Sequence, residues 1–463
     1  MQPTKDVLTF TRKHAGATLT EQALKIAFDF CEDYKIFLNN SKTEGCCVET
    51  VIEMAEKKGY TPFIPGKHYA PGDKIYVRNR GAAIILSTIG TKPAEEGFRL
   101  IASHIDSPRL DLKPNPLYET DEIAYLKTHY YGGVRKYQWP TIPLALHGVV
   151  FKADGEMVHI NIGEDENDPL FYMTDLLPHL AGEQRKKTLG EAFHGESMNI
   201  IIGSLPDRDS DKKDKDKTKL AVLKLLNEKY GITEADFHSA DIKAVPAYKA
   251  RDIGLDRSLM AAYGHDDRVC AYTSLMAEFS VEKPAYTTVT VLADKEEVGS
   301  AGNTGLNSNY VLYFIEELAE AAGAKPRRVL SATKALSADV NAAFDPEFAS
   351  VFEKRNTCFI NHGVGIAKYV GSGGKGNTVD ASAAYMSFVR TLLDKADVKW
   401  QVGELGRVDE GGGGTVAKFL AQLDMDIVDI GVPVLSMHAP YEVVSKIDVY
   451  MAFRAFEAFY KNS

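Results

Sequence analysis

The chain has 463 residues, of which 44% are hydrophobic and 25% are charged, a composition typical of a globular protein. This length exceeds what one hydrophobic core usually supports, so we expect two domains. The 64 acidic residues outnumber the 54 basic ones and give a net charge of −10. That charge argues against nucleic acid or an anionic membrane as the main partner and favours small molecules or peptides.

The cysteines and the N-terminal segment predict a cytoplasmic protein. Five cysteines without a CxxC pair disfavour both a disulfide framework and a thiolate zinc site. The N-terminal segment MQPTKDVLTF has no apolar core of a signal peptide, and apolar runs such as AAIIL (82–86) are too short to span a bilayer. Any metal would therefore need histidine and carboxylate ligands.

The beginning of the chain predicts two helices followed by strands. Residues 18–41 have the spacing of an amphipathic helix, opened by the capping box Thr18-Leu19-Thr20-Glu21. A second helix is predicted at about 48–58. Three β-rich runs follow within 74–104, and the last of them ends at His104.

Residues 112–244 differ in composition from the rest of the chain. They hold short β runs, many prolines and glycines, and the charged run DRDSDKKDKDK at 207–217, which we expect to be a solvated loop before a helix at 218–230. We therefore predict an inserted β-rich domain at 112–244, between two segments of a larger domain at 1–111 and 245–463.

The last part of the chain alternates strand and helix patterns. β-Branched runs at 286–293 and 432–437 alternate with helical patterns such as 381–396. This alternation predicts an α/β fold in which helices cover a sheet.

Polar residues gather at the ends of the predicted strands. The segments in question are ASHIDSP (102–108), YGHDDR (263–268), ADKEEVGS (293–300), SADVN (337–341) and SMHAPYE (436–442). Ligands of open α/β sheets bind beyond the carboxyl ends of the strands, so these segments could converge on one crevice. Each one alone is more often ordinary surface. Together they supply two imidazoles, one bridging carboxylate and two terminal carboxylates, which is the ligand set of a dinuclear zinc site.

Two of these segments contain pairs of residues whose spacing suggests separate roles. In an extended segment Glu296 and Glu297 point to opposite sides, so one can bind metal while the other takes a proton from the attacking water. His104 and Asp106 share a face of an extended strand, so Asp106 could hold the His104 tautomer. The alternatives are an exposed acidic turn and a surface polar pair.

Two glycine-rich runs are candidates for binding loops. GSGGKGN (371–377) holds Lys375 but has no Gly-Lys-Ser/Thr, which excludes a phosphate loop of the P-loop type. The backbone of GGGGT (411–415), around Gly413, could approach a substrate closely and stabilise an anion with its amides. A flexible turn is the alternative for this second run.

The five motifs resemble those of one known family. SHIDSPRLDLKPNP, GHDDR, DKEEVGS, SADVN and SMHAPYEVV are similar, in order and approximate spacing, to the aspartyl aminopeptidases, which are cytoplasmic zinc exopeptidases. The resemblance covers nearly the whole chain. It implies an aminopeptidase that hydrolyses the N-terminal peptide bond of peptides. It also implies a zinc-exopeptidase-like sheet with an inserted dimerisation domain, and a homo-oligomer built from dimers, a tetrahedral dodecamer in this family.

The resemblance also implies a metal centre. It would hold two Zn²⁺ per subunit on five ligands, namely His104, Asp266, Glu297, Asp339 and His438. Asp266 would bridge the ions, with His104 and Asp339 completing one site and Glu297 and His438 the other. Glu296 would be the general base. Co²⁺ and Mn²⁺ accept the same ligands.

The resemblance assigns two further residues. His147, in IPLALHG (142–148), resembles a family histidine that reaches the active site of the neighbouring subunit. Lys375 is the basic group that we associate with an acidic substrate side chain. Eukaryotic members carry Asn where this chain has Asp267, in a GHDDR segment closer to bacterial relatives. This departure leaves the preference for acidic N-terminal residues open.

Two other functions would use the same residues. A dinuclear-zinc deacylase or aminoacylase would place the same cluster on a non-peptide amide and would differ in what binds the amine side. A metal-stabilised oligomeric scaffold without turnover would need the ligands but not the additional base Glu296.

Overall fold

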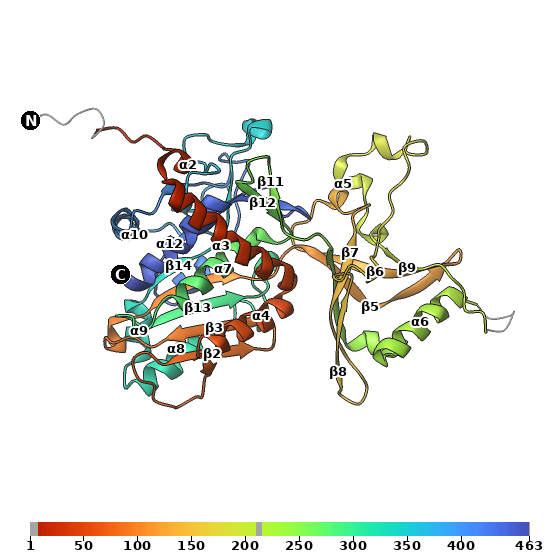
Figure 1. Ribbon diagram of the computed structural model, residues 1–463, viewed down its shortest axis with the longest axis horizontal. Coiled ribbons are helices and arrows are strands. Elements are labelled where there is room, and N and C mark those ends of the chain that lie inside the picture. Colours follow the sequence, from red (N-terminus) through yellow and green to blue (C-terminus); the bar gives the residue numbers. More distant parts are fainter. Residues whose placement is uncertain (1–7, 210–214, 463) are drawn as a thin grey trace, which may run out of the picture. The chain divides into compact units, whose positions relative to one another are not determined.

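The computed structural model describes residues 8–209 and 215–462. These form two compact units (Figure 1). Of the described residues, the first unit comprises 8–106, 250–437 and 442–462, and the second comprises 107–209, 215–249 and 438–441.

The second unit contains the stretch 112–244, whose composition differs from that of the rest of the chain. The grouping of His438–Tyr441 with this unit is not evident from the order of the chain. Residues 210–214, in the middle of the charged run predicted to be a loop, lie outside the described residues.

A nine-stranded sheet forms the centre of the first unit, in the order β1-β2-β3-β13-β4-β14-β18-β16-β17. Its strands are β1 (Thr61–Pro62), β2 (Lys74–Asn79), β3 (Ala83–Thr88), β4 (Arg99–His104), β13 (Thr288–Ala293), β14 (Lys334–Ser337), β16 (Val364–Ala367), β17 (Trp400–Val402) and β18 (Asp426–Gly431). The neighbours β13, β4, β14 and β18 run parallel, whereas β3 and β16 are antiparallel to this group. The carboxyl ends of the parallel strands therefore meet at one edge of the sheet.

A smaller sheet of the same unit has the order β11-β12-β20-β19-β15. Its strands are β11 (Arg251–Ile253), β12 (Leu259–Ala262), β15 (Asn341–Ala342), β19 (Pro433–Leu435) and β20 (Glu442–Ser445). The α-helices of the unit are α2 (Ala15–Thr18), α3 (Glu21–Asn40), α4 (Glu44–Lys57), α7 (His265–Phe279), α8 (Tyr310–Ala321), α9 (Pro326–Ala332), α10 (Ala383–Lys395), α11 (Ala417–Ala421) and α12 (Lys446–Asn462). Short 3₁₀ turns are η1 (Ala94–Glu96), η6 (Glu296–Val298) and η7 (Pro346–Val351).

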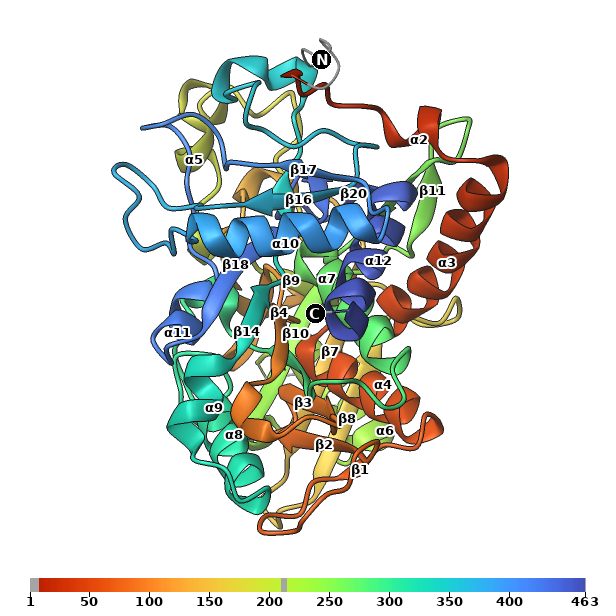
Figure 2. The ribbon, with the colours of Figure 1, turned by 90° about the vertical axis from the view of Figure 1, so that its left-hand side faces the viewer.

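Helices cover both faces of the large sheet (Figure 2). Alternate residues of a strand point to opposite faces. Ile84 and Leu86 of β3 accordingly belong to the core under α3, α4, α7 and α12, whereas Ile85 belongs to the core under α8, α9 and α11. This arrangement confirms the predicted α/β fold.

The two helices predicted near the start of the chain correspond to α3 and α4, and both begin at other residues than predicted. The hydroxyl of Thr20 accepts a hydrogen bond from the N–H of Ala23 (3.2 Å), so Thr20 is the N-cap of α3. The predicted capping box at Thr18 is wrong, because Thr18 is the last residue of the preceding helix α2. Thr43 caps α4 in the same way, which moves its start to Glu44 instead of residue 48.

The second unit is built on an antiparallel six-stranded sheet in the order β8-β7-β10-β5-β6-β9. Its strands are β5 (Arg109–Thr120), β6 (Ile123–Tyr131), β7 (Leu144–Phe151), β8 (Met157–Ile162), β9 (Ile200–Gly203) and β10 (Ala240–Pro246). Its helices are α5 (Leu189–Ala192) and α6 (Lys217–Tyr230), with 3₁₀ turns η2 (Lys136–Gln138), η3 (Gln184–Lys186), η4 (Gly195–Ser197) and η5 (Glu234–Ser239). Val222 of α6 packs in the core of this sheet with Leu126 and Ile200.

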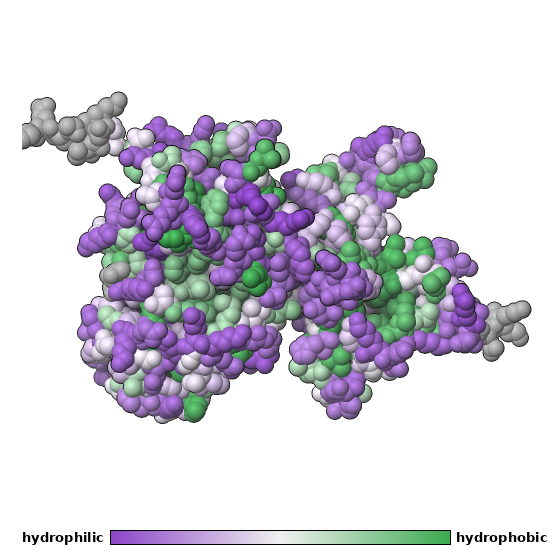
Figure 3. Space-filling model, viewed as in Figure 1, coloured by the Kyte–Doolittle hydropathy of each residue, from purple (hydrophilic) through white to green (hydrophobic). Residues whose placement is uncertain are grey.

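This unit also has hydrophobic surface (Figure 3). Its exposed large apolar residues include Leu170, Leu177, Leu180, Leu189 and Leu225. Among residues 8–209 and 215–462, no helix combines the length and the apolar character needed to cross a membrane.

A cluster of charged side chains joins α3, β11 and α12 in the first unit. The Oδ1 atom of Asp252 lies 2.9 Å from Lys35 Nζ and 2.7 Å from Lys446 Nζ. Its Oδ2 atom lies 3.0 Å from Arg257 Nε. Burial alone would raise the pKa of Asp252, but Lys446 and Lys35 outweigh burial and lower it to about 2. The ionised carboxylate therefore stabilises the folded state.

Replacing Asp252 with Asn should lower the free energy of unfolding at pH 7 by about 2 kcal/mol, the equivalent of the lowered pKa. Because the folded-state pKa lies below the ordinary value of 3.8, this stabilisation is present above pH 4. It is lost as the pH falls toward about 2. Urea unfolding at pH 7 and pH 3 measures both effects. Asp29→Asn, which breaks the exposed Lys25–Asp29 pair on α3, is the control. A loss for Asp252→Asn no larger than that of the control would contradict this role.

Candidate metal centre

Three parallel strands bring polar side chains to one edge of the large sheet. His104 is the last residue of β4, and Asp339 follows the end of β14 by two residues. Glu296 and Glu297 follow β13 in the turn η6, and Asp266 lies in the first turn of α7. Because the carboxyl ends of β13, β4 and β14 share an edge, residues far apart in the sequence come together there.

His104 is the centre of this group, and the residue is 1% exposed. Its Nε2 atom lies 3.2 Å from Asp266 Oδ1 and 3.9 Å from Asp339 Oδ1. Its Nδ1 atom lies 3.0 Å from the backbone oxygen of Asp106 and 3.3 Å from Asp106 Oδ1. Both contacts of Nδ1 are with acceptors, so this nitrogen carries the proton and donates it. Nε2 faces the carboxylates of Asp266 and Asp339, so it is the nitrogen that a metal ion held by these acids would take as a ligand.

Asp106 also holds the turn that contains the two glutamates. Its Oδ1 atom accepts the backbone N–H of Glu296 and its Oδ2 atom accepts that of Glu297, each at 3.2 Å. The carboxylate is fully buried. The predicted contact with His104 is therefore only part of what this side chain does, because Asp106 connects the end of β4 with the turn after β13.

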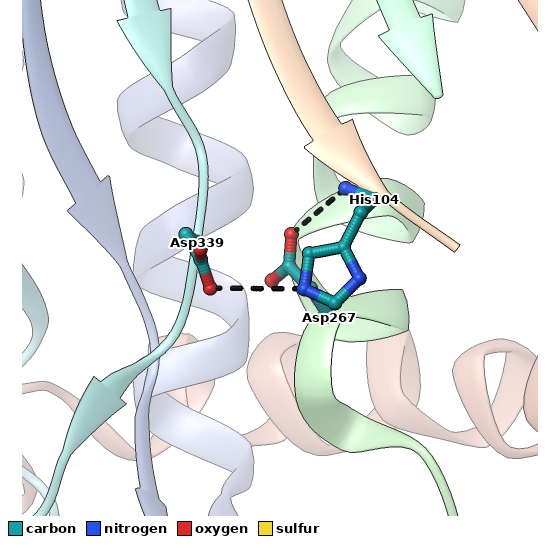
Figure 4. Close-up of side chains that lie close together, drawn as sticks. All are labelled: His104, Asp267 and Asp339. Atoms are coloured by element: carbon teal, nitrogen blue, oxygen red, sulfur yellow. Dashed lines mark hydrogen bonds and ion pairs between the residues drawn. The ribbon is translucent and has the colours of Figure 1, made fainter. Parts of the chain in front are cut away.

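Asp267 is a residue of the site that the sequence patterns did not predict. Its Oδ2 atom accepts the backbone N–H of His104 at 3.3 Å, and Figure 4 shows its carboxylate between His104 and Asp339. Among the residues that the structure describes, two groups of side chains have ligand atoms within 4.8 Å of one another. One is His104 with Asp267 and Asp339, and the other is His104 with Asp266 and Glu297. The only sequence signal for Asp267 is its place beside Asp266 in GHDDR.

The electrostatics of the site favour a cation. Burial raises the pKa of Asp339 well above its usual range, and the carboxylates of Asp267 and Asp266 raise it further. Burial alone would lower the pKa of His104, but contacts with Asp106 and Asp266 reverse this and raise it well above the ordinary value. A divalent cation would relieve the repulsion between these acids. One imidazole nitrogen among several carboxylate oxygens is a donor set that suits zinc.

The two other predicted histidines belong to the second unit. His438 Nδ1 lies 3.2 Å from the backbone oxygen of Gly133. His147 is buried in β7, where its Nε2 lies 3.0 Å from Glu164 Oε1. The other oxygen of Glu164 lies 2.5 Å from Lys249 Nζ. Within its own unit His147 therefore contacts an ion-paired carboxylate, and the roles of both histidines at the metal centre stay predictions.

The two glycine-rich loops lie against each other in the first unit. Gly413 donates its N–H to the backbone oxygen of Val370 (2.8 Å), so this amide is already engaged. Lys375 Nζ lies 2.9 Å from Asp380 Oδ2 and 3.8 Å from the centroid of the Tyr369 ring. The ammonium group of Lys375 therefore has an acidic partner within its own loop region.

The chain is similar to known proteins along nearly its whole length. Residues 37–460 match the peptidase family described as aminopeptidase I zinc metalloprotease (M18). The probable M18 family aminopeptidase 1 of Clostridium acetobutylicum is 46% identical over 458 residues, which cover 97% of this chain and 98% of that protein. The crystal structure of aminopeptidase I from the same organism has a TM-score of 0.93 at 44% identity. That of the M18 aminopeptidase from Thermotoga maritima has a TM-score of 0.93 at 40% identity. Each structure is covered completely, along 98% of this chain.

Asp106→Asn should weaken the affinity for zinc by about 10- to 100-fold, because the amide offers only one acceptor where the carboxylate offers two. The remaining NH₂ group would then face an N–H donor. Competition with a zinc chelator measures the affinity. Asp448→Asn is the matched control, since Asp448 is a buried carboxylate that accepts the N–H groups of Asn361 and Gly363. Equal zinc affinities in the Asp106 variant and the wild type would contradict the role of Asp106 in holding the proposed metal ligands in place.

Proposed function

The chain belongs to the M18 family of zinc aminopeptidases, and we propose that it binds two Zn²⁺ at the cluster around His104. The proposed ligands are His104, Asp266, Glu297, Asp339 and His438. Membership of the family establishes a zinc-dependent aminopeptidase that hydrolyses the N-terminal peptide bond, as the resemblance implied. It also argues against a deacylase and against a scaffold without turnover.

One observation carries the assignment of the ligands. The Nε2 atom of His104 faces Asp266 at 3.2 Å and Asp339 at 3.9 Å, while its other nitrogen is bound to Asp106. Asp266 also has a ligand atom within 4.8 Å of Glu297, which supports its role as the bridge between two ions. We assign Asp267 the role of fixing the backbone of His104, since its carboxylate accepts that N–H.

The residues of the chain divide the chemistry among them. Bound zinc would polarise the scissile carbonyl and lower the pKa of a water molecule. Glu296 takes a proton from the attacking water and passes it to the leaving amine. Asp106 keeps Glu296 in place by holding its backbone N–H. The excess of carboxylates at the site attracts the free α-ammonium group of the peptide, which places the N-terminal bond at the reacting centre.

Glu296→Gln should keep both zinc ions bound and lose nearly all turnover, because it removes the proton shuttle without removing a ligand. Asp266→Ala is the contrasting variant and should lose zinc, since it removes the bridge. Zinc content by mass spectrometry and kcat with aminoacyl substrates are measured on both. If Glu296→Gln retained most of the wild-type kcat, or if Asp266→Ala kept full zinc occupancy, the respective role would be contradicted.

We propose Lys375 as the group that recognises an acidic N-terminal side chain. A substrate carboxylate would compete with Asp380 for the same ammonium group, which lies 2.9 Å from Asp380. Gly413 belongs to the neighbouring loop and would place backbone close to the substrate.

Lys375→Ala should lower kcat/KM for Asp and Glu substrates at least about tenfold more than for Leu substrates, since the lost pair is charge-assisted. Matched aminoacyl substrates with Asp, Glu and Leu side chains measure this ratio. The control is Lys368→Ala, which removes the other lysine paired with Asp380 and should leave the ratio unchanged. Equal losses on acidic and apolar substrates would exclude Lys375 from the specificity pocket.

We propose that the chain is a homo-oligomer whose dimer contact lies in the second unit. The exposed leucines of that unit support this, because monomers rarely expose many large apolar residues on one unit. The resemblance to the aspartyl aminopeptidases supports the further assembly of dimers into a tetrahedral dodecamer, which would admit short or unfolded peptides. The cytoplasm is the compartment that we predict from the sequence.

His147 provides a test of this assembly, since we propose that it acts in the active site of the neighbouring subunit. Its imidazole would stabilise the developing oxyanion, a contribution on the order of 3 kcal/mol for one donor. His147→Ala and Glu296→Ala should each be nearly inactive alone. A mixed dimer of the two variants contains one site that takes Glu296 from the first variant and His147 from the second.

Co-expression of the two variants with different affinity tags isolates these mixed dimers. Their activity should recover to a substantial fraction of the wild type. If His147 acts within its own subunit, every site of the mixture lacks one group and no activity returns. Absence of recovery in oligomers that carry both tags would refute action across the interface.

A further inference from the structure

The backbone around Asp266 departs from the helix that begins there. Asp266 has φ −82° and ψ 108°, and Asp267 has φ −115° and ψ 25°, neither of which is helical. The N–H of Asp266 has no carbonyl of its own helix to bond, because it lies in the first turn of α7. Glu442 meets this need, since its Oε2 atom accepts the N–H of Asp266 at 3.0 Å. Glu442 is the last residue of the motif SMHAPYE, but the motif alone does not indicate this contact.

Glu442 is fixed in the place from which it reaches Asp266. It is the first residue of β20, pairs in register with Ala262 of β12, and is 1% exposed. A buried carboxylate destabilises a protein unless hydrogen bonds compensate its lost hydration. One such hydrogen bond comes from the N–H of Asp266, at the start of α7. Glu442, at the start of strand β20, thus accepts a hydrogen bond from the first turn of helix α7.

The residue before Asp266 is held as firmly. His265 is fully buried, with Nδ1 2.9 Å from the hydroxyl of Tyr34 and Nε2 3.3 Å from the backbone oxygen of Met260. Met260 accepts from Nε2–H, so Nδ1 accepts the hydroxyl proton of Tyr34. The ring of Tyr34 is stacked on Tyr272 of α7, with the centroids 5.0 Å apart. The side chain of His265 therefore ties the start of α7 to α3 and β12.

These contacts lie on both sides of one proposed ligand. To bind the same metal ion, the carboxylate of Asp266 and Nε2 of His104 must both lie within ligand distance of one point. Asp266 Oδ1 lies 3.2 Å from His104 Nε2. A rotation of its backbone would move the carboxylate away from that point. Loss of a hydrogen bond that orients a metal ligand commonly lowers the metal affinity by about 10- to 100-fold.

We propose that Glu442 and the Tyr34–His265 pair are positioning residues that hold Asp266 in the conformation required to bind zinc. This inference rests on the proposed role of Asp266 as a ligand. Glu442 acts because its side chain is long enough to place an acceptor oxygen at the N–H of Asp266. The negative charge of Glu442 is less important than this length. Removing either contact lowers the affinity for zinc without removing a ligand.

Two substitutions of Glu442 separate reach from charge. Glu442→Gln keeps an oxygen acceptor at the same distance and should stay within about threefold of the wild-type zinc affinity. Glu442→Asp keeps the charge but shortens the side chain by one methylene, and should weaken zinc binding about tenfold or more. Tyr34→Phe keeps the stacked ring and removes the hydroxyl, and should weaken zinc binding severalfold. Zn²⁺ affinity is measured on the full chain by competition with a chelator, and the melting temperature of the zinc-free protein is measured beside it.

Glu278→Gln is the matched control, at the other end of the same helix. Glu278 is a fully buried carboxylate that accepts the hydroxyls of Thr88 (2.7 Å) and Thr290 (3.0 Å). Its substitution should lower the melting temperature and leave the zinc affinity unchanged. If Glu442 had a purely structural role, its variants would likewise lower the melting temperature and leave the zinc affinity unchanged.

The proposal is overturned if Glu442→Asp and Tyr34→Phe bind zinc as the wild type does. It is overturned equally if Glu442→Gln loses more affinity than Glu442→Asp, or if Glu278→Gln loses as much as the Glu442 variants. Should Glu442→Asp not fold, Tyr34→Phe and Glu442→Gln decide the outcome. Asp266→Ala distinguishes this failure from that of the proposed function, because full zinc binding in that variant would remove Asp266 as a ligand altogether.

Discussion

The site depends on one buried carboxylate, that of Asp106. It receives Nδ1 of His104 on one side and the N–H groups of Glu296 and Glu297 on the other. A charge without solvent is stable only where several donors compensate it. The Asp106 carboxylate therefore holds in place the same N–H donors that stabilise its charge. This reciprocity places the proposed ligand His104 and the proposed base Glu296 relative to each other, although they lie far apart in the chain.

The remainder of the site repeats this use of buried carboxylates. Asp267 holds the N–H of His104, and Glu442 holds that of Asp266. In each case an acidic side chain binds the backbone of a neighbouring element, and the side chain of that element faces the centre. The acids therefore accumulate, and together with burial their mutual repulsion raises the pKa of Asp339. A bound cation relieves this repulsion, so the site is most stable when it carries metal.

Local patterns predicted much of the fold. The three strand runs within 74–104 become β2, β3 and β4, because alternation and turn residues are properties of a few neighbouring positions. The predicted starts of α3 and α4 were wrong, and for α3 the reason is that Thr18 and Thr20 are both competent caps and only the preceding helix α2 decides between them. Nothing local indicated that His438–Tyr441 would group with the second unit.

The sequence by itself determined the family, the α/β fold and zinc-dependent peptide hydrolysis, because five ordered motifs carry the residue types that this chemistry needs. It did not determine how those residues are held. The tertiary structure alone brought Asp267 beside Asp339, gave Asp106 two backbone partners after β13, and placed Glu442 behind Asp266. Such contacts depend on the register of parallel strands and on the start of a helix, which arise only when distant segments pack together.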